Sequence, residues 1–453
     1  MFSKTLKEIQ MMVGGSGLAT QFEDIIATGV TIDSRTVATG NLYIPIIGAR
    51  ANGHDFVPAV FKDGAAAVLW QDGIPGAPTD GPVIMVADTK KALQELAMAY
   101  KDSLNMKIVG ITGSNGKTST KDILASILAT RYRVHKTPGN FNSEFGMPLT
   151  LLMAPADTEI AVLEMGMRGL GQIKLLSDMA KPDVSMITCI GEAHIEELGS
   201  RENISIAKFE ITSGLSEAGL FVYHGDEPLL DARIAEAQPK FKMVPFGDAP
   251  TNDYYPTHIE VADNGMNFKI NQSDLDFRLS VLGKHNVMNA IAAMAVARHF
   301  DVDFADIQRG LANIEMSKMR MEISYAKNGM MMIDDTYNSS PTSVRATLDL
   351  LYTLEGYDKK IVVLGDMLEL GDHEITYHQT TGAEIDPQKI DALLTFGPLA
   401  KHISEHAKVP LVRHFDDKPS LATYLESISD ARTVCLVKGS RGMALEAVIK
   451  NLL

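Results

Sequence analysis

The sequence has little that could cross-link the chain or anchor it in a membrane. It contains 453 residues but only two cysteines, Cys189 and Cys435, each inside an apolar run. Such cysteines are typical of buried side chains in a reducing compartment and argue against a disulfide framework. No apolar run approaches the roughly 20 residues of a membrane-spanning helix, and Met1–Gly15 has no signal-peptide core. We therefore expect a cytoplasmic protein without stable membrane insertion.

Basic residues are also in deficit. The chain has 42 Lys and Arg against 57 Asp and Glu, which gives a formal net charge of −15. This argues against nucleic acid as a partner, because neutralising a phosphate backbone needs clustered Lys and Arg. A small anionic ligand remains compatible, since a nucleotide needs only a local basic pocket and aimed backbone amides.

The length and the order of the apolar segments predict three α/β domains. At about 150 residues per domain, a chain of 453 residues holds roughly three. We expect a first domain over residues 1–105, a central domain over 106–317 and a third over 318–453. In the last two, strands alternate with helices, which predicts parallel sheets covered by helices on both faces. The predicted strands are Asn41–Ile47, Ala65–Trp70, Val83–Val86, Lys107–Thr112, Ile160–Leu163, Val184–Ile190, Leu220–Tyr223, Met330–Ile333, Lys360–Leu364, Ala392–Phe396 and Thr433–Val437.

The strongest local signal is a glycine-rich turn between a predicted strand and a predicted helix. The strand Lys107–Thr112 runs into this turn, and the helix carries Lys117 and Thr118 in its first turn. Backbone amides and the positive end of the helix then point at one place, which favours a phosphate group. The lysine can neutralise β- and γ-phosphate charge, and the neighbouring hydroxyl can hold Mg²⁺. The predicted nucleotide-binding residues of this turn are Thr112, Gly113, Ser114, Asn115, Gly116, Lys117, Thr118 and Ser119.

This turn departs in one place from the general phosphate-loop pattern Gly-x-x-x-x-Gly-Lys-[Ser/Thr]. The pattern puts its first glycine at Ile111, whereas Gly110 and Gly113 are the glycines present. An exposed Gly-Lys-Thr turn is the alternative. The strand before and the helix after favour a phosphate loop.

Two further polar residues follow predicted strands of the central domain. Glu164 ends the run Ile160–Leu163, and His194 follows the run Val184–Ile190. Ligands of parallel sheets gather at the carboxyl ends of the strands, and a carboxylate there suits the hard Mg²⁺ ion. A solvated loop acid and a structural histidine are the alternatives. Lys208 lies on a predicted helix, where a solvated surface lysine is the default interpretation, and nothing in its spacing alone indicates a functional role.

Polar residues at later helix starts and strand ends suit the rest of a nucleotide. Asn286 and Asn289 lie three apart in a predicted helix and share a face suited to an adenine edge, although Asn286 also suits a helix cap. Asp335 follows a buried strand, where it is suited to ribose or base contacts or to a helix-capping turn. The segment Lys438–Gly442 places two basic residues and two glycines after a strand, which fits an anion site or a basic surface turn.

Together these segments resemble the Mur ligase family along nearly the whole chain. The matching segments are Asp33–Arg35, Gly53–Phe56, Thr112–Thr118, Gly139–Gly146, Leu163–Gly166, Gly191–His194, Ala207–Lys208, Gly283–Asn289, Asp334–Pro341, Leu364–Gly371 and Lys438–Arg441. The phosphate loop marks only the wider family. The segments at 139–146, 334–341 and 364–371 favour the member that joins D-alanyl-D-alanine to a UDP-N-acetylmuramoyl-tripeptide. Ser143 departs from the pattern, which commonly has a second Asn there.

The resemblance implies that the three domains bind different ligands. It implies an N-terminal α/β domain for the UDP-linked substrate, a central P-loop parallel-sheet domain for ATP, and a C-terminal Rossmann-like α/β domain. Lys117 would hold the β- and γ-phosphates, while Thr118 and Glu164 would bind one Mg²⁺. A second Mg²⁺ would lie at His194 and at Lys208, whose carbamylation turns a cation into an oxygen ligand.

The resemblance also implies the remaining contacts. Asn286 and Asn289 would face adenine, Asp335 would bind ribose, and Arg320 would contact the phosphates. The implied substrate-binding residues are Ser34, Arg35, Gly48, Arg50, Asn140, Asn142, Asn338, Lys438 and Ser440.

The implied reaction is ATP-dependent amide-bond formation by a monomer. A carboxylate is a poor electrophile, so ATP would first pass its γ-phosphoryl group to the tripeptide carboxylate. The amine of D-alanyl-D-alanine would then attack the acyl phosphate. The alternatives are a ligase of this type with another amine acceptor, a folylpolyglutamate-type ligase, a kinase and a non-catalytic ATP-binding protein. The first domain weighs against the folate ligase, and the acidic charge weighs against a nucleic-acid-stimulated ATP-binding protein.

Overall fold

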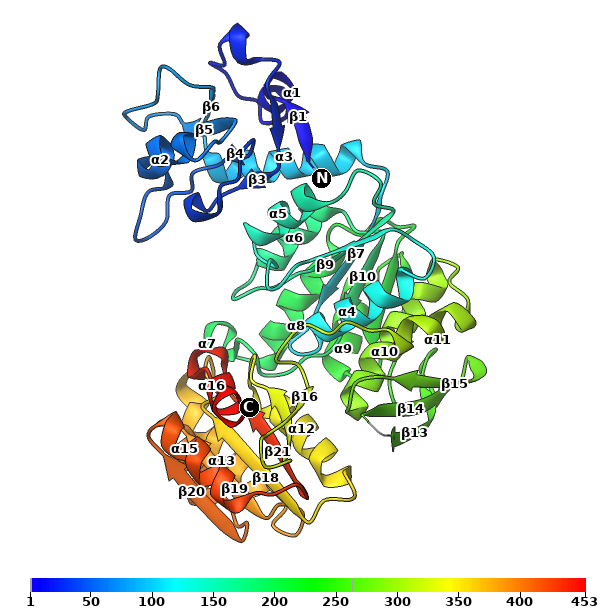
Figure 1. Ribbon diagram of the computed structural model, residues 1–453. Helices are drawn as coiled ribbons and strands as arrows, with labels where there is room; N and C mark the ends of the chain where they lie inside the picture. Colours follow the sequence, from blue (N-terminus) through cyan, green and yellow to red (C-terminus); the bar gives the residue numbers. More distant parts are fainter. Residues whose placement is uncertain (1, 263) are drawn as a thin grey trace.

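The chain folds into three units that follow one another along an elongated molecule (Figure 1). The computed structural model describes residues 2–262 and 264–453. We call residues 2–105 the N-terminal unit, 106–317 the central unit and 318–453 the C-terminal unit, following the boundaries predicted above. In Figure 1 the central unit lies between the other two. No helix within the described ranges is long and apolar enough to cross a membrane.

The N-terminal unit is built on a four-stranded parallel sheet in the order β3-β4-β5-β6. The predicted strand Val83–Val86 has these bounds in the structure, whereas the predicted strand Asn41–Ile47 pairs over only two residues. The elements are β1 (Ser3–Thr5), α1 (Leu6–Met12), β2 (Ile26–Thr28), β3 (Val30–Thr31), β4 (Leu42–Tyr43), α2 (Val57–Lys62), β5 (Ala67–Gln71), β6 (Val83–Val86) and α3 (Thr89–Ser103).

The central unit is built on a six-stranded parallel sheet in the order β12-β11-β10-β7-β9-β8. Its strands are β7 (Lys107–Thr112), β8 (Val134–Lys136), β9 (Ile160–Glu164), β10 (Val184–Ile187), β11 (Leu220–His224) and β12 (Lys242–Phe246). Its helices are α4 (Lys117–Leu128), α5 (Gly146–Met153), α6 (Gln172–Ala180), α7 (Ile195–Leu198), α8 (Arg201–Phe209), α9 (Pro228–Ala237), α10 (Lys284–His299) and α11 (Phe304–Ala312). The carboxyl ends of β7, β9 and β10 therefore meet at one edge, where open parallel sheets bind ligands.

Both faces of this sheet are buried, which explains the continuous apolar runs of its strands. Val109 and Ile111 of β7 join a core with Ile123 of α4, against which α10 packs. Ile108 points the other way and joins a core with residues of α3, α5 and α6, such as Leu93. The second core links the N-terminal and central units.

The central unit also carries a three-stranded antiparallel sheet that the sequence analysis did not predict. Its strands are β13 (Pro256–Ala262), β14 (Gly265–Ile270) and β15 (Ser273–Leu279). Only one face is buried, through residues such as Phe268 and Phe277, whereas most of β13 is exposed or half-buried. A half-exposed sheet shows alternation and no continuous apolar run.

The C-terminal unit is a six-stranded sheet in the order β16-β17-β21-β18-β19-β20, parallel except for β16. Its strands are β16 (Glu322–Tyr325), β17 (Met331–Asp335), β18 (Lys359–Gly365), β19 (Ala392–Phe396), β20 (Leu411–Phe415) and β21 (Thr433–Lys438). Its helices are α12 (Pro341–Thr353), α13 (Glu374–Glu384), α14 (Ala400–His406), α15 (Lys418–Ile428) and α16 (Glu446–Leu452). The predicted α/β class with parallel sheets is confirmed.

A buried carboxylate fixes the segment that leads from the central to the C-terminal unit. Asp122 of α4 is 1% exposed. Its Oδ2 accepts hydrogen bonds from the backbone N and the Oγ of Ser317, at 2.9 and 2.7 Å. Its Oδ1 accepts one from Lys136 Nζ at 2.6 Å and lies 3.5 Å from Nζ of the equally buried Lys121. The connecting segment therefore starts from a fixed point beside the helix that follows the phosphate loop.

We expect Asp122→Ala to lower the free energy of unfolding by about 3–5 kcal/mol, because it leaves the Lys121 ammonium buried without its carboxylate. Chemical denaturation followed by circular dichroism measures this loss. Asp157→Ala is the matched control, because Asp157 pairs with Arg133 at an exposed site, 3.3 Å apart, where such pairs contribute less than about 1 kcal/mol. Equal small losses in both variants would contradict the role of Asp122.

Candidate active site

The loop between β7 and α4 depends on two glycines. Gly113 has φ +153°, and a Cβ atom there would overlap Thr188 Oγ1. Gly116 has φ +81°, and a Cβ atom there would lie 2.6 Å from Asn289 Oδ1. These two positions let β10 and α10 approach the loop closely, so the loop is packed and not an exposed turn.

Residues that follow β10 hold this loop by hydrogen bonds. Ser114 N donates to Cys189 O at 3.0 Å, and Gly191 N donates to Ser114 Oγ at 2.8 Å. Thr188 Oγ1 donates to Asn115 O at 2.5 Å. Sequence reasoning assigned no role to Thr188, because a support for a distant loop leaves no local motif.

Glu164 connects the phosphate loop to the loop that contains Asn142. Thr118 Oγ1 donates to Glu164 Oε2, and Asn142 Nδ2 donates to Glu164 Oε1, both at 2.8 Å. Glu164 is 3% exposed, so it is not a solvated loop acid. Ser119 is buried in the same first turn of α4. The structure thus brings the predicted residues Thr118, Glu164 and Asn142 together.

The Lys117 ammonium lies over the same loop. Its Nζ donates to Gly113 O at 2.7 Å. Burial lowers the pKa of Lys117, and the positive charge of Arg320 lowers it further, although Glu164 opposes both effects. This position suits a lysine that a phosphate group would draw away from the loop carbonyls.

The residues around Glu164 fit a magnesium ion that shares its shell with phosphates. A carboxylate and a hydroxyl, here Glu164 and Thr118, are ligands that Mg²⁺ prefers. Within the described ranges, no three His, Cys, Asp or Glu side chains form a group able to hold a metal ion. Mg²⁺ commonly uses one or two protein oxygens and completes its shell with substrate phosphates and water.

Lys208 is buried, which corrects its interpretation as a solvated surface lysine. It is 1% exposed on α8, and no hydrogen bond or ion pair reaches its ammonium from the described residues. Burial lowers the pKa of Lys208 well below its usual value, and the charge of Lys117 lowers it further, although Cys189 opposes this. On α8, Lys208 lies four residues after the buried Ile204 and beside the buried Ala207, so it belongs to the face of the helix that packs inward.

His194 turns toward the C-terminal unit. Its backbone is left-handed, with φ +67°, and its Nδ1 lies 2.9 Å from Glu369 Oε2. In residues 2–262 and 264–453, no hydrogen bond or ion pair joins His194 to Glu164 or to Lys208. Sequence reasoning gave Glu369 no role, although it lies in one of the matched segments.

Arg320 reaches from the connecting segment to the phosphate loop. Its Nη2 donates to Thr118 Oγ1 at 3.3 Å, and its guanidinium lies 4.1 Å from the centre of the Tyr337 ring. The flanking residues Met319 and Met321 both have left-handed backbones, with φ +60° and +56°. Arg320 is therefore aimed by an unusual backbone, at the position predicted for a phosphate contact.

The two asparagines of α10 are neighbours, but Asn286 is not a helix cap. Gly283 is the N-cap of α10, and Asn286 Nδ2 donates at 2.8 Å to the carbonyl of Leu282, the residue before that cap. Asn289 Nδ2 donates to Asn286 Oδ1 at 3.2 Å. Because Asn289 also lies against Gly116, this face of α10 packs on the loop between β7 and α4.

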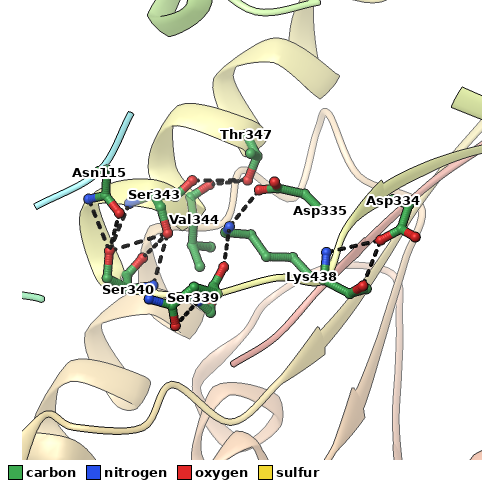
Figure 2. Close-up of polar contacts among 11 residues, drawn as sticks. Asn115, Asp334, Asp335, Ser339, Ser340, Ser343, Val344, Thr347 and Lys438 are labelled. Carbon is green, nitrogen blue, oxygen red and sulfur yellow. Dashed lines mark hydrogen bonds and ion pairs between the residues drawn. The ribbon is translucent and has the colours of Figure 1, made fainter. Parts of the chain in front are cut away.

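Figure 2 shows the cluster that the C-terminal unit contributes. Lys438 is 2% exposed, and its Nζ donates to Asp335 Oδ2 at 2.5 Å and to Asn338 O at 2.9 Å. Arg441 of the same segment is exposed and pairs with Glu446, so only Lys438 departs from a basic surface turn. Ser340, the N-cap of α12, accepts from Asn115 Nδ2 at 3.3 Å (Figure 2). The cluster therefore touches the phosphate loop directly.

The predicted residues of the N-terminal unit lie apart from this site. Ser34 and Arg35 form a short 3-10 helix, and Arg35 pairs with Asp33 at 2.7 Å. Gly48 and Arg50 are exposed in a loop of the same unit. Within the described part of the chain, no hydrogen bond or ion pair joins these four residues to residues 112–119.

Asn140 is the other predicted substrate residue outside the cluster. It is exposed, and its carbonyl accepts a hydrogen bond from Asn142 N of the same loop at 2.7 Å. Because Asn142 binds Glu164, this loop links an exposed surface to the buried carboxylate.

We expect Gly113→Ala to weaken nucleotide binding by about 10- to 100-fold, because the added methyl group must displace Thr188 or the loop. Equilibrium dialysis with labelled ADP and Mg²⁺ measures this change. Gly169→Ala is the control, since a Cβ atom at Gly169 meets nothing within 4 Å. Unchanged nucleotide affinity in Gly113→Ala would show that the loop tolerates a side chain at Gly113. It would contradict the claim that close packing against Thr188 determines the shape of the loop.

Comparisons with known proteins show which family the chain matches. Three family profiles match: the Mur ligase family, catalytic domain over residues 27–101, the Mur ligase middle domain over 111–297, and the Mur ligase, glutamate ligase domain over 319–441. The chain is 45% identical over 457 residues to the UDP-N-acetylmuramoyl-tripeptide–D-alanyl-D-alanine ligase of Bacillus subtilis (strain 168), covering 100% of this chain and 99% of that one. It is 32% identical over 459 residues to the ligase of the same name from Escherichia coli (strain K12), with 100% and 99% coverage.

Solved structures agree with the sequence relatives. A crystal structure of MurF from Acinetobacter baumannii superposes with a TM-score of 0.90 at 29% identity and covers 99% of this chain and 98% of that chain. MurF ligase from Thermotoga maritima in complex with ADP gives 0.84 at 28% identity, with 94% and 96% coverage. The predicted fold and the resemblance read from the motifs are confirmed. The chain belongs to the Mur ligase family and is an ATP-dependent ligase.

Proposed function

We propose that this enzyme uses ATP to join D-alanyl-D-alanine to UDP-N-acetylmuramoyl-tripeptide, giving the UDP-muramoyl-pentapeptide of peptidoglycan synthesis. The observation that carries the proposal is identity of 45% over the full chain to a ligase of that name. The geometry supports it, because Lys117, Thr118 and Glu164 meet at the phosphate loop where the central and C-terminal units touch.

In this proposal the loop amides and Lys117 bind the phosphates. Asp335 and Lys438 lie across the unit boundary, where Asp335 is placed for the ribose and α10 presents Asn286 and Asn289 to adenine. Thr118 and Glu164 hold Mg²⁺, which when bound offsets the charge that develops on the transferring phosphoryl group. Arg320, already 3.3 Å from Thr118, adds positive charge at the same point.

Lys208 is the residue whose environment supports a second magnesium site. Burial disfavours the charged form of Lys208 and so raises the share of neutral amine, whose nitrogen can attack CO₂, lose a proton and become a carbamate. The carbamate is anionic and supplies oxygen ligands, which would remove the cost of an unpaired buried ammonium. His194 is the proposed second ligand at this site.

The remaining assignments extend the same proposal. The N-terminal unit binds the UDP-sugar through Ser34, Arg35, Gly48 and Arg50, and Asn140 and Asn142 face the muramoyl-peptide. Asn338, Lys438 and Ser440 contact substrate from the C-terminal unit. We place a monomer in the cytoplasm, consistent with the two unpaired cysteines, and keep the domain boundaries 1–105, 106–317 and 318–453.

Mass spectrometry of the products tests the proposal. With ATP, Mg²⁺, UDP-N-acetylmuramoyl-tripeptide and D-alanyl-D-alanine, we expect the pentapeptide, ADP and free phosphate in equal amounts. Lys117→Ala should abolish all three while the circular dichroism spectrum stays unchanged. A phosphorylated product without free phosphate would indicate a kinase, and product formation only with another amine would indicate a ligase for a different acceptor.

We expect Lys208→Met to abolish ligation and yet to raise the free energy of unfolding at neutral pH, in CO₂-free buffer, by about 1–3 kcal/mol. The variant replaces an unpaired buried amine by an apolar side chain of similar length. Because the pKa of Lys208 is lowered in the folded chain, the unfolded chain binds more protons between that pKa and 10.5. The stability of the wild type should therefore rise with pH across this window, and that of the variant less steeply.

Denaturation curves at several pH values measure both effects. Bicarbonate with Mg²⁺ should raise the melting temperature of the wild type and leave Lys208→Met unchanged, because only the wild type can form the carbamate. If Lys208→Met were less stable than the wild type in CO₂-free buffer, the claim that Lys208 is buried without a stabilising partner would be contradicted.

A further inference from the structure

We propose that Glu369 is a positioning residue through which the docked C-terminal unit orients His194 for ligation. This inference rests on the proposed function, in which His194 serves the active site. Glu369 follows β18 in the C-terminal unit, and His194 precedes α7 in the central unit. Their side chains meet across the boundary, with Glu369 Oε2 at 2.9 Å from His194 Nδ1.

The backbone around Glu369 also docks on the central unit. Glu369 O accepts from Glu196 N at 3.4 Å. Gly371, with φ +60°, lies so close that a Cβ atom there would be 3.0 Å from Glu196 Cα. The contact between Glu369 and His194 is therefore part of a fitted surface between α7 and the 3-10 helix at Gly371–His373.

The segment that carries Glu369 is hydrogen-bonded to Ser440, a proposed substrate-binding residue of the C-terminal unit. Leu368 N donates to Ser440 Oγ at 2.9 Å, and Ser440 N donates to Asp366 O at 3.0 Å. Met367 N donates to the buried His378 Nε2 at 2.9 Å. Hydrogen bonds thus join Ser440, which follows β21, to the segment that carries Glu369. A shift of Ser440 would move Glu369 and change its contact with His194.

Glu369 occupies a backbone conformation that its side chain disfavours. Its φ is +64°, in the left-handed region, where a residue with a Cβ atom costs about 1–2 kcal/mol relative to the right-handed conformation. Glycine would adopt it at little cost. A glutamate at a position suited to glycine indicates that the carboxylate contributes something other than fold stability.

The chemistry of Glu369 and His194 indicates what the carboxylate contributes. A histidine that binds a metal usually donates its other ring N–H to a carboxylate, which fixes the tautomer and the ring orientation. The 2.9 Å between Glu369 Oε2 and His194 Nδ1 favours a proton on Nδ1, which would leave the His194 lone pair on Nε2, where it can act as a ligand or base. Since the carboxylate comes from another unit, His194 acquires this tautomer only when the C-terminal unit is docked.

Glu369→Gly tests the proposal, because it removes the carboxylate and relieves the left-handed backbone. We expect kcat to fall about 10- to 100-fold, with KM for ATP within about twofold and the melting temperature unchanged or higher. Asp372→Asn is the matched control: Asp372 is exposed in the same segment, and no hydrogen bond or ion pair of its side chain is present in the described residues.

A spectroscopic readout separates positioning from loss of structure. With ¹⁵N-labelled histidine at a pH where the imidazole is neutral, and His194→Ala to assign the signal, the wild type should show His194 protonated on Nδ1. Glu369→Gly should shift His194 toward the Nε2–H form, and Asp372→Asn should not. An unchanged His194 signal or an unchanged kcat in Glu369→Gly would overturn the proposal, whereas a wild type that makes no pentapeptide would instead overturn the proposed function.

Discussion

The site depends on a loop that has no side chain at two of its positions. At Gly113 and Gly116 a single added carbon would collide with Thr188 or Asn289. Because both positions are bare, β10 approaches the loop from one side and α10 from the other. The loop is then held in one shape by hydrogen bonds from residues that follow β10. Fixed amides can bind phosphate without rearranging, which is how a preorganised site stabilises charge.

The charges gathered around this loop lower the stability of the fold and serve its chemistry. Lys208 is buried without a partner, and Lys117 is held against backbone carbonyls. Glu164, in contrast, is buried and satisfied by Thr118 and Asn142. A site that keeps Lys208 buried and without a partner among the described residues must be stabilised by the rest of the molecule, here by apolar cores on both faces of the central sheet. Asp122 illustrates the structural use of buried charge, since all its partners are present.

The units meet through polar contacts at the same edge of the central sheet. Asn115 reaches Ser340, and Thr342 Oγ1 donates to Glu192 Oε2 at 2.5 Å. Together with the contact between His194 and Glu369, these interactions surround the carboxyl ends of β7 and β10. The polar groups at this edge are therefore supplied by two units, so the relative position of the units determines which of these contacts form.

The elements that could be predicted from the sequence are those whose bounds follow from a local pattern of apolar residues. Strands buried on both faces, such as β7 and β19, have the predicted bounds, because they form continuous apolar runs. The edge strands β8, β12, β16 and β20 were missed, since an edge strand is partly exposed and lacks such a run.

Contacts between segments that are distant in the sequence could not be predicted from the residue pattern of either segment. The phosphate loop and Glu164 were predicted from strand ends, whereas Lys208 was assigned to the surface because lysine is mostly exposed, although it shares the inward face of α8 with Ile204. The contact of Asn115 with Ser340 joins residues 225 positions apart. Such contacts follow from the docking of whole units, and a single sequence carries no local sign of them.

The central claim is that the loop at residues 112–119 grips the nucleotide phosphates through backbone amides and one ammonium group. Calorimetric titration of the purified wild-type protein with Mg²⁺ and ATP tests it most directly. The account predicts heat that saturates at one nucleotide per chain and that inorganic triphosphate reduces by competition. A titration without heat at any temperature tried, with competition absent in equilibrium dialysis, would contradict it.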